Sequence, residues 1–158
     1  MTFTHIDSNG NAKMVDVSDK KESVRIAIAK GKIITKPETI KAILEQEVKK
    51  GDVLTVAKIG GIMAAKQCSN LIPLCHPIPL TNVDIEFEID KKSNCINITG
   101  TAKTSAKTGV EMEAMTAVSL AALIIYDMCK AIDKGMVISD ISLQEKSGGR
   151  SGHWKKPL

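Results

Sequence analysis

An acidic and a basic side chain lie three residues apart in an apolar stretch toward the end of the chain. The two are Asp127 and Lys130, and their neighbours are mostly apolar: Met128, Cys129, Ala131 and Ile132. Residues at this spacing project from nearly one face of a helix, so the two side chains can contact each other. They form either an ordinary surface ion pair, which is the commoner case, or an acid–base pair in which each group tunes the other's proton affinity.

Two glutamates precede this pair in the same predicted helix. Glu111 and Glu113 are two residues apart and point to opposite sides, which excludes a paired-carboxylate site of the glycosidase kind. Glu111 instead fits a capping box with Thr108 at the start of the helix. Glu113 and Asp127 share a face but are separated by about four turns, or about 21 Å. One small substrate can touch both only if symmetry-related helices contribute to the same site.

A histidine lies in a loop that three prolines make stiff and non-helical, Pro73, Pro77 and Pro79. In such a loop His76 is a candidate general base, phosphate donor or metal ligand, although a lone histidine is more often structural. The adjacent Cys75 has a poor spacing for joint metal chelation, and no second histidine lies at a typical ligand spacing. We therefore assign no metal site.

Basic residues from separated segments are candidates for binding phosphate groups. They are Lys50, Lys66, Lys146 and Arg150, and the amides of Gly148-Gly149 lie next to the last two. In the simpler interpretation they are four solvated charges. The sequence lacks the GxxxxGK[ST] order of a P-loop, so the C-terminal segment alone is a weak phosphate signal.

The elements predicted to position these residues alternate between strands and helices. Strands are predicted at 24–29, 83–89, 96–102 and 136–144, and helices at 37–50, 53–67 and 108–133. This order is α+β and ferredoxin-like, β-α-β-β-α-β with an extra helix, with an antiparallel sheet covered by helices on one face. A protein of this size commonly hides an apolar open sheet face by oligomerising, so we expect at least a dimer. Gly60-Gly61 predicts that the backbone of the second helix packs closely against another element. A subunit interface is one place where such packing could occur.

Length and composition favour one small domain that binds a small ligand. The 158 residues form one predicted domain, 1–158, with a flexible N-terminal arm (1–21) and a flexible basic tail (146–158). The net charge of +4 arises from 22 basic and 18 acidic residues mixed along the chain, which suits phosphate-bearing small ligands better than a nucleic-acid duplex. Two Phe, one Tyr and one Trp also provide few stacking platforms for single strands.

The cysteines and the apolar runs indicate a cytosolic protein. The four cysteines lack CxxC spacing, and the first residues do not resemble a signal peptide. The longest apolar run, 117–126, is broken by Ser119 and is about half of the roughly 20 residues that a membrane span needs. We therefore expect a cytoplasmic protein without a membrane segment.

Three segments together closely resemble the MoaC family, the cyclic pyranopterin monophosphate synthases of molybdenum cofactor biosynthesis. They are LIPLCHPIPLTNV around His76, TGVEMEAMTAVSLAALIIYDMCKAIDK from Thr108, and EKSGGRSG near the C-terminus. The similarity covers nearly the whole chain, from the MVDVS segment to Gly152. The combination is far more specific than any one of the segments.

The resemblance implies a ferredoxin-like subunit in a homohexamer, a trimer of dimers, with active sites at subunit interfaces. It implies a lyase that converts (8S)-3',8-cyclo-7,8-dihydroguanosine 5'-triphosphate to cyclic pyranopterin monophosphate and releases pyrophosphate. It also implies that a partner radical enzyme, which cyclises GTP, supplies the substrate. The resemblance implies no cofactor and leaves open whether a divalent ion accompanies the triphosphate.

The resemblance also implies roles for individual residues. Asp127 resembles the general acid/base and Lys130 its partner, and Lys50 and Lys146 are similar to catalytic lysines. Five positions correspond to substrate-contacting segments, namely Leu74, Cys75, His76, Met112 and Glu113. Three basic residues resemble the groups around the triphosphate and the reacting centre, namely Arg25, Lys66 and Lys146. Arg150 departs from the lysine that many relatives carry, and this change keeps a phosphate contact but not a titrating role.

Two other functions remain alternatives at this stage. A non-catalytic module that binds a nucleotide between subunits would not need Asp127, Lys130 and Lys50 together. A basic nucleic-acid-binding protein would show strongly salt-dependent affinity for DNA or RNA, and the scarcity of aromatic residues argues against it.

Overall fold

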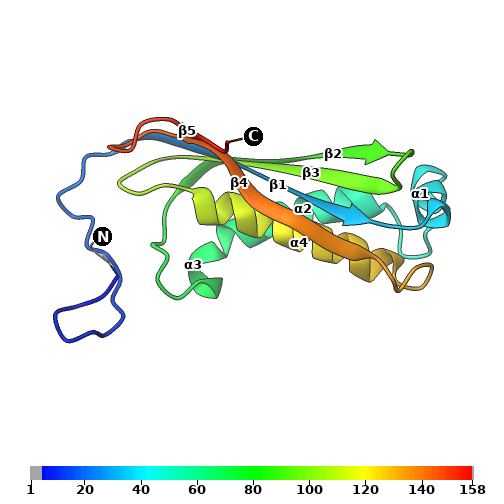
Figure 1. The fold of residues 1–158 in the computed structure, drawn as a ribbon, viewed down its shortest axis with the longest axis horizontal. Helices are drawn as coiled ribbons and strands as arrows, with labels where there is room; N and C mark the ends of the chain where they lie inside the picture. Colours follow the sequence, from blue (N-terminus) through cyan, green and yellow to red (C-terminus); the bar gives the residue numbers. More distant parts are fainter. Residues whose placement is uncertain (1–4, 158) are drawn as a thin grey trace.

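A five-stranded antiparallel sheet with helices packed on one face forms the body of the protein (Figure 1). The computed structural model describes residues 5–157. The strands are β1 (Ser23–Ile34), β2 (Leu80–Asp90), β3 (Cys95–Ala106), β4 (Val137–Ser147) and β5 (Trp154–Lys155). The helices are α1 (Pro37–Leu44), α2 (Val53–Lys66), α3 (Cys68–Leu71) and α4 (Glu111–Cys129). The strand order β2-β3-β1-β4-β5 contains the ferredoxin-like arrangement and confirms the predicted fold class.

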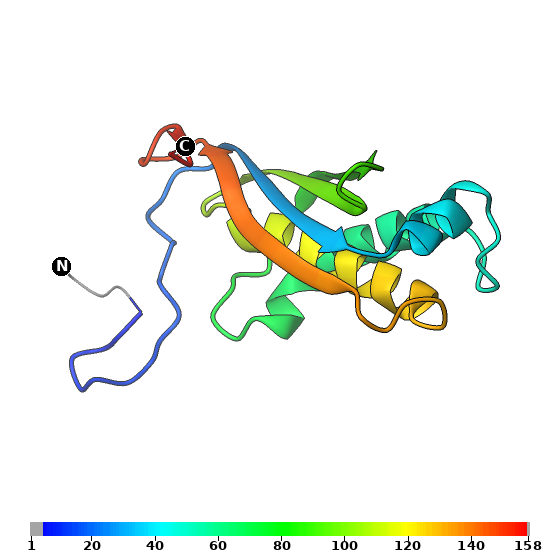
Figure 2. The same cartoon turned by 45° about the vertical axis from the view of Figure 1, so that its right-hand side comes forward.

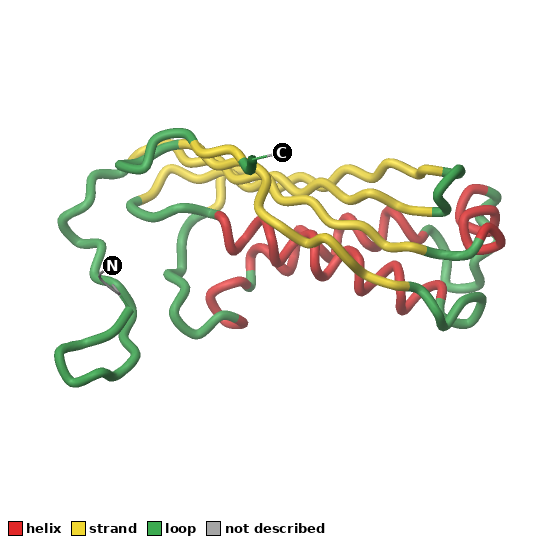
Figure 3. The backbone as a smooth tube through the Cα atoms, in the orientation of Figure 1, coloured by secondary structure: helices red, strands yellow, loops and turns green. Residues whose placement is uncertain are grey.

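Small residues let α4 lie close against the middle of the sheet. The sheet contributes buried Ala27, Ala29 and Ala102, and the facing side of α4 contributes buried alanines and Val118. A β-carbon on Gly31 or Gly100 would come within 2.9 or 2.7 Å of the Val118 side chain, so glycine is required at both crossings. Figures 2 and 3 show α2 and α4 side by side under the same face of the sheet. This close packing fixes the position of α4 along the sheet.

The first two helices differ in part from their predicted form. The helix predicted at 37–50 ends at Leu44 because Gln46 adopts a left-handed φ of 55°, so Lys50 lies in a loop instead of at a helix end. Asp52 caps α2 as predicted and accepts a hydrogen bond from the Thr55 amide at 3.1 Å. The close packing predicted for Gly60-Gly61 is present, but its partners lie in the same subunit, on α4 and β2.

The strand before the C-terminus is longer than predicted. The strand predicted at 136–144 extends to Ser147, so Lys146 belongs to β4 and not to the tail predicted at 146–158. Two further residues of that tail, Trp154 and Lys155, pair with β4 as β5. Regular ladder hydrogen bonds explain the difference, because Lys146 and Ser147 pair with Ala27 and Ile26 of β1.

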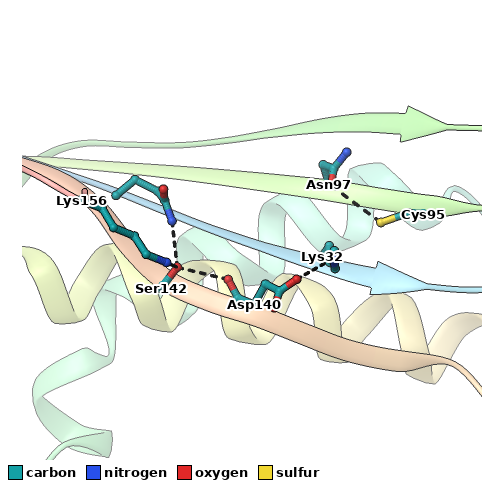
Figure 4. Close-up of polar contacts among 7 residues, drawn as sticks. Lys32, Cys95, Asn97, Asp140, Ser142 and Lys156 are labelled. Carbon is teal, nitrogen blue, oxygen red and sulfur yellow. Dashed lines mark hydrogen bonds and ion pairs between the residues drawn. The ribbon is translucent and has the colours of Figure 1, made fainter. Parts of the chain in front are cut away.

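The face of the sheet that the helices leave open is mixed: it carries polar pairs as well as exposed apolar side chains. Lys32, which alternates with core residues of β1, pairs with Asp140 at 2.5 Å on this face, and Ser142 binds Lys156 at 3.1 Å (Figure 4). Exposed apolar side chains lie on the helices, at Val56, Ile59, Met63 and Leu123, and also on the strands, at Val24, Ile34 and Val137. Exposed apolar surface is therefore present on both the helical layer and the sheet.

The apolar composition of α4 follows from its place in the fold. α4 is long and apolar enough to cross a membrane by length and composition alone, and half of its most apolar window is buried inside the subunit. A core helix of a globular protein has the same properties. We therefore treat α4 as a core helix.

Candidate active site

Three of the predicted catalytic residues meet at the C-terminal end of α4. Asp127 lies in the last turn of α4, and Lys130 is its C-cap residue. Lys50 comes from the loop between α1 and α2. Its ammonium group lies 2.7 Å from one Asp127 carboxylate oxygen, and the Lys130 ammonium group lies 2.8 Å from the other. Lys50 also donates to the Asp127 main-chain carbonyl at 2.8 Å. One carboxylate thus holds two ammonium groups in fixed positions.

The two lysines set the protonation state of this cluster. Hydrogen bonds from Lys130 and Lys50 lower the pKa of Asp127 to about 2, and the hydrogen bond to Asp127 raises the pKa of Lys130. At neutral pH the resting state is therefore a carboxylate between ammonium groups, so the available proton donors are the lysines. The Asp127 side chain is 56% exposed in the single subunit. Burial by another surface is needed to strengthen its electrostatic effect.

A second group of predicted residues lines a cavity at the N-terminal end of α4. The cavity has a volume of about 300 Å³. It contains all five positions predicted to contact substrate: Leu74, Cys75, His76, Met112 and Glu113. The proline-rich loop supplies the first three, and the first turn of α4 supplies the other two. This arrangement brings together two segments that are distant in the sequence.

Burial favours the neutral form of two ionisable groups in this cavity. Glu113 is only 4% exposed, and desolvation raises the pKa of its carboxyl. Desolvation likewise raises the pKa of the Cys75 thiol, so Cys75 is a thiol and not a thiolate nucleophile at neutral pH. His76 Nε2 lies 2.7 Å from the main-chain oxygen of Val15. Because a carbonyl only accepts, Nε2 carries a proton in this contact.

We expect Glu113→Gln to stabilise the fold, because it removes the cost of keeping a carboxylate in a buried place. The free energy of unfolding at pH 7 should rise by on the order of 1 kcal/mol. The raised pKa means that wild-type stability decreases as pH rises from below the unfolded value near 4.5 through the folded pKa. The advantage of the variant should therefore shrink as pH falls toward 4. Urea unfolding at both pH values measures this, and a stability difference that is the same at both contradicts the assignment.

Two predicted basic residues lie beside this cavity. Lys146 on β4 forms an ion pair of 2.8 Å with Glu111. The predicted capping box is therefore wrong: Val110 is the N-cap residue without a side-chain cap, and Glu111 binds Lys146 instead. The Arg25 guanidinium donates to the main-chain oxygens of Ala106 and Lys107 at 3.0 and 3.1 Å. Both accepting groups are neutral, so Arg25 keeps its positive charge available for a ligand.

The glycine-rich loop after β4 packs against Arg25. Gly149 has a φ of 71°, and a β-carbon on it would overlap the Arg25 guanidinium. We expect Gly149→Ala to displace this guanidinium and to raise KM at least about tenfold through the lost charged hydrogen bonds. Gly152→Ala is the matched control, because Gly152 has a similar φ of 63° but nothing within 4 Å of a β-carbon. Equal KM values for the two variants would mean that backbone strain, and not displacement of the Arg25 guanidinium, causes the change in KM.

The two groups of residues cannot act on one small molecule within a single subunit. Glu113 and Asp127 lie at opposite ends of α4, about 21 Å apart along the helix, and Figure 1 shows these ends at opposite ends of the body. Lys66, at the end of α2, is exposed and lines neither the cavity beside Glu113 nor the Asp127 cluster. One small molecule could contact both groups only if surfaces of two subunits met.

The chain is similar over nearly its whole length to known proteins of one family. The model of the MoaC family matches residues 14–149. The chain is 58% identical over 154 residues to a cyclic pyranopterin monophosphate synthase of Desulfitobacterium hafniense, covering 98% of this chain and 94% of the relative. It is 59% identical over 152 residues to the synthase of Clostridium perfringens, covering 96% of each chain. It is 56% identical over 158 residues to that of a Thermoanaerobacter species, covering 100% of both.

Proposed function

The chain belongs to the MoaC family, and from this premise we propose that it is a cyclic pyranopterin monophosphate synthase of molybdenum cofactor biosynthesis. The reaction is the conversion of (8S)-3',8-cyclo-7,8-dihydroguanosine 5'-triphosphate to cyclic pyranopterin monophosphate. It releases pyrophosphate, which makes the enzyme a lyase. The observation that carries the proposal is the pairing of a lysine–carboxylate cluster for proton transfer with a separate cavity that has Lys146 and Arg25 beside it for the phosphates.

The Asp127 cluster supplies the proton transfers that open and rebuild the ring system. Lys50 and Lys130 are ammonium groups held on one carboxylate, 2.7 and 2.8 Å from it. Either lysine can donate a proton to a ring nitrogen or oxygen, and the resulting amine can take a proton back. Asp127 keeps both lysines in place and balances their charge through the cycle.

The cavity beside Glu113 holds the substrate, and its basic border holds the phosphates. A ribose hydroxyl attacks the innermost phosphorus, its proton passes to a base, and the bond from this phosphorus to pyrophosphate breaks. Lys146 and Arg25 lie where they can neutralise the charge of the departing pyrophosphate. Leu74, Cys75, His76, Met112 and Glu113 orient the ring, and Lys66 contributes a further positive charge from another subunit.

This division of the site requires at least a dimer, and we propose that the dimers assemble further into a homohexamer, a trimer of dimers. Within each dimer the Asp127 end of one α4 meets the Glu113 end of the other. The exposed apolar residues of the helical layer, Val56, Ile59, Met63 and Leu123, support association through the helices. We propose that the enzyme is cytoplasmic and has no cofactor of its own. It would act on the product of the radical enzyme that cyclises GTP.

Product analysis tests this function. The chain is incubated with the enzymatically prepared cyclic dihydro-GTP, and the products are separated and identified by mass spectrometry. We expect equal amounts of pyrophosphate and the cyclic monophosphate, and neither without the protein. An assembled protein that binds the compound and leaves it unchanged would identify a ligand-sensing module instead.

A further inference from the structure

Residues 13–22, which follow the first part of the N-terminal arm, contain no helix or strand and run as a loop outside the sheet (Figure 2), but two hydrogen bonds attach them to the body of the protein. His76 binds the main-chain oxygen of Val15 at 2.7 Å. The Lys107 ammonium, from the loop after β3, donates to the main-chain oxygen of Ser18 at 2.7 Å. Both anchors bind main-chain carbonyls, so they hold the arm and leave its side chains free for other contacts.

The anchored arm forms part of the walls of two neighbouring cavities. Val15, Val17 and Lys20 line the cavity beside Glu113. Lys20 also lines a larger cavity of about 480 Å³, together with Lys21 of the arm. The complete lining of that larger cavity is Asp19, Lys20, Lys21, Ser23, Arg25, Gly149, Arg150 and Ser151. Lys20 thus lies at the boundary between the two cavities.

The larger cavity has the charge of an anion-binding site. Its lining contains four basic side chains and one acidic one. Within residues 5–157, none of these four basic groups lies within 4.0 Å of a carboxylate. Convergent cations without acidic partners favour a ligand with several negative charges. A phosphate chain has this chemistry and an extended shape.

We propose that residues 13–22 form a strap over the substrate pocket and that Lys20 on this strap is a further substrate-binding residue. Its ammonium group binds the phosphate chain where the chain passes from the cavity beside Glu113 into the cavity beside Arg25. Lys107 is a positioning residue that keeps the strap closed. This inference rests on the proposed function, and it gives a role to a segment for which the sequence predicts only a flexible arm.

Binding of inorganic pyrophosphate and tripolyphosphate, measured by calorimetry, tests the role of Lys20. We expect Lys20→Ala to weaken binding of both about tenfold, since it removes one charged hydrogen bond, and to raise KM with little change in kcat. Lys20→Arg should retain binding. Lys13→Ala is the matched control, because Lys13 is an exposed arm lysine that lines neither cavity. Unchanged affinity and KM in Lys20→Ala would overturn the proposal.

Hydrogen exchange of the arm amides tests the strap itself. Saturating pyrophosphate should slow exchange of residues 15–20 in the wild-type protein. Lys107→Met should exchange faster at the same residues and bind pyrophosphate more weakly, although Lys107 lines neither cavity. Exchange rates at residues 15–20 that change neither with pyrophosphate nor in Lys107→Met would rule out a strap.

The two readouts separate this inference from the proposed function. Pyrophosphate binding that depends on Lys20, without turnover of the cyclic dihydro-GTP, would reject the synthase function and retain the anion-binding strap. Full turnover together with an unchanged KM in Lys20→Ala would reject the strap and retain the synthase.

Discussion

Asp127→Asn is expected to slow pyrophosphate release by a factor of about 10²–10⁴, the range that proton transfer by a positioned side chain contributes. The amide is neutral and cannot hold both Lys50 and Lys130 as ammonium groups on one carboxylate. The two lysines would then repel each other and leave their positions. Release of pyrophosphate from the cyclic dihydro-GTP under single-turnover conditions measures the chemical step directly.

Lys130→Ala should cause a loss of the same order, because it removes one of the two proton donors. Asp140→Asn is the matched control for Asp127→Asn, because it also changes an aspartate to asparagine. It breaks the Lys32–Asp140 ion pair of 2.5 Å on the open face of the sheet. Exposed ion pairs contribute about 0–1 kcal/mol to stability, so Asp140→Asn should leave both folding and activity intact. Similar activity of Asp127→Asn and Asp140→Asn would contradict the role of the cluster.

Lys146→Met is expected to lower kcat about 10²–10³-fold, the usual effect of removing one group that stabilises transition-state charge. Methionine keeps most of the side-chain volume in β4 but removes the ammonium group. Glu111 also loses its ion-pair partner, so its carboxylate would add negative charge where pyrophosphate must leave. Initial rates at saturating substrate measure the change in kcat.

Two further variants separate charge from packing at this position. Glu111→Gln combined with Lys146→Met removes the unpaired carboxylate, and we expect it to recover only part of the loss. Lys156→Met is the matched control, because Lys156 lies beyond β5 and binds Ser142 on the open face of the sheet. A Lys146→Met enzyme with normal kcat would place the departing pyrophosphate elsewhere.

Local spacing was enough to predict the fold and one half of the candidate site. Alternation in β2 and helical spacing in α4 identify both elements, because each pattern depends on residues that are close in sequence. The Asp127–Lys130 contact was predictable for the same reason, since the residues are three apart. The ferredoxin-like order of elements then left few possible topologies.

The other half of the site depends on contacts between distant residues, which spacing does not reveal. Lys50 and Asp127 are 77 residues apart, and Lys107 lies 89 residues from Ser18. Glu111 was assigned to a capping box because a local motif was the only partner visible in the sequence. The pairing of β4 with β1 supplies Lys146 as its actual partner.

Mixed assemblies test the central claim that one active site is divided between the Asp127 end of one subunit and the Lys146 end of another. Asp127→Asn and Lys146→Met chains are co-expressed in equal amounts, and pyrophosphate release by the assembled pool is compared with that of each variant alone. Half of the dimers would then be mixed, and each would contain one intact site of its two, so we predict about a quarter of wild-type activity. Activity no higher than the mean of the two separate variants, in a pool shown to contain mixed assemblies, would contradict the divided site.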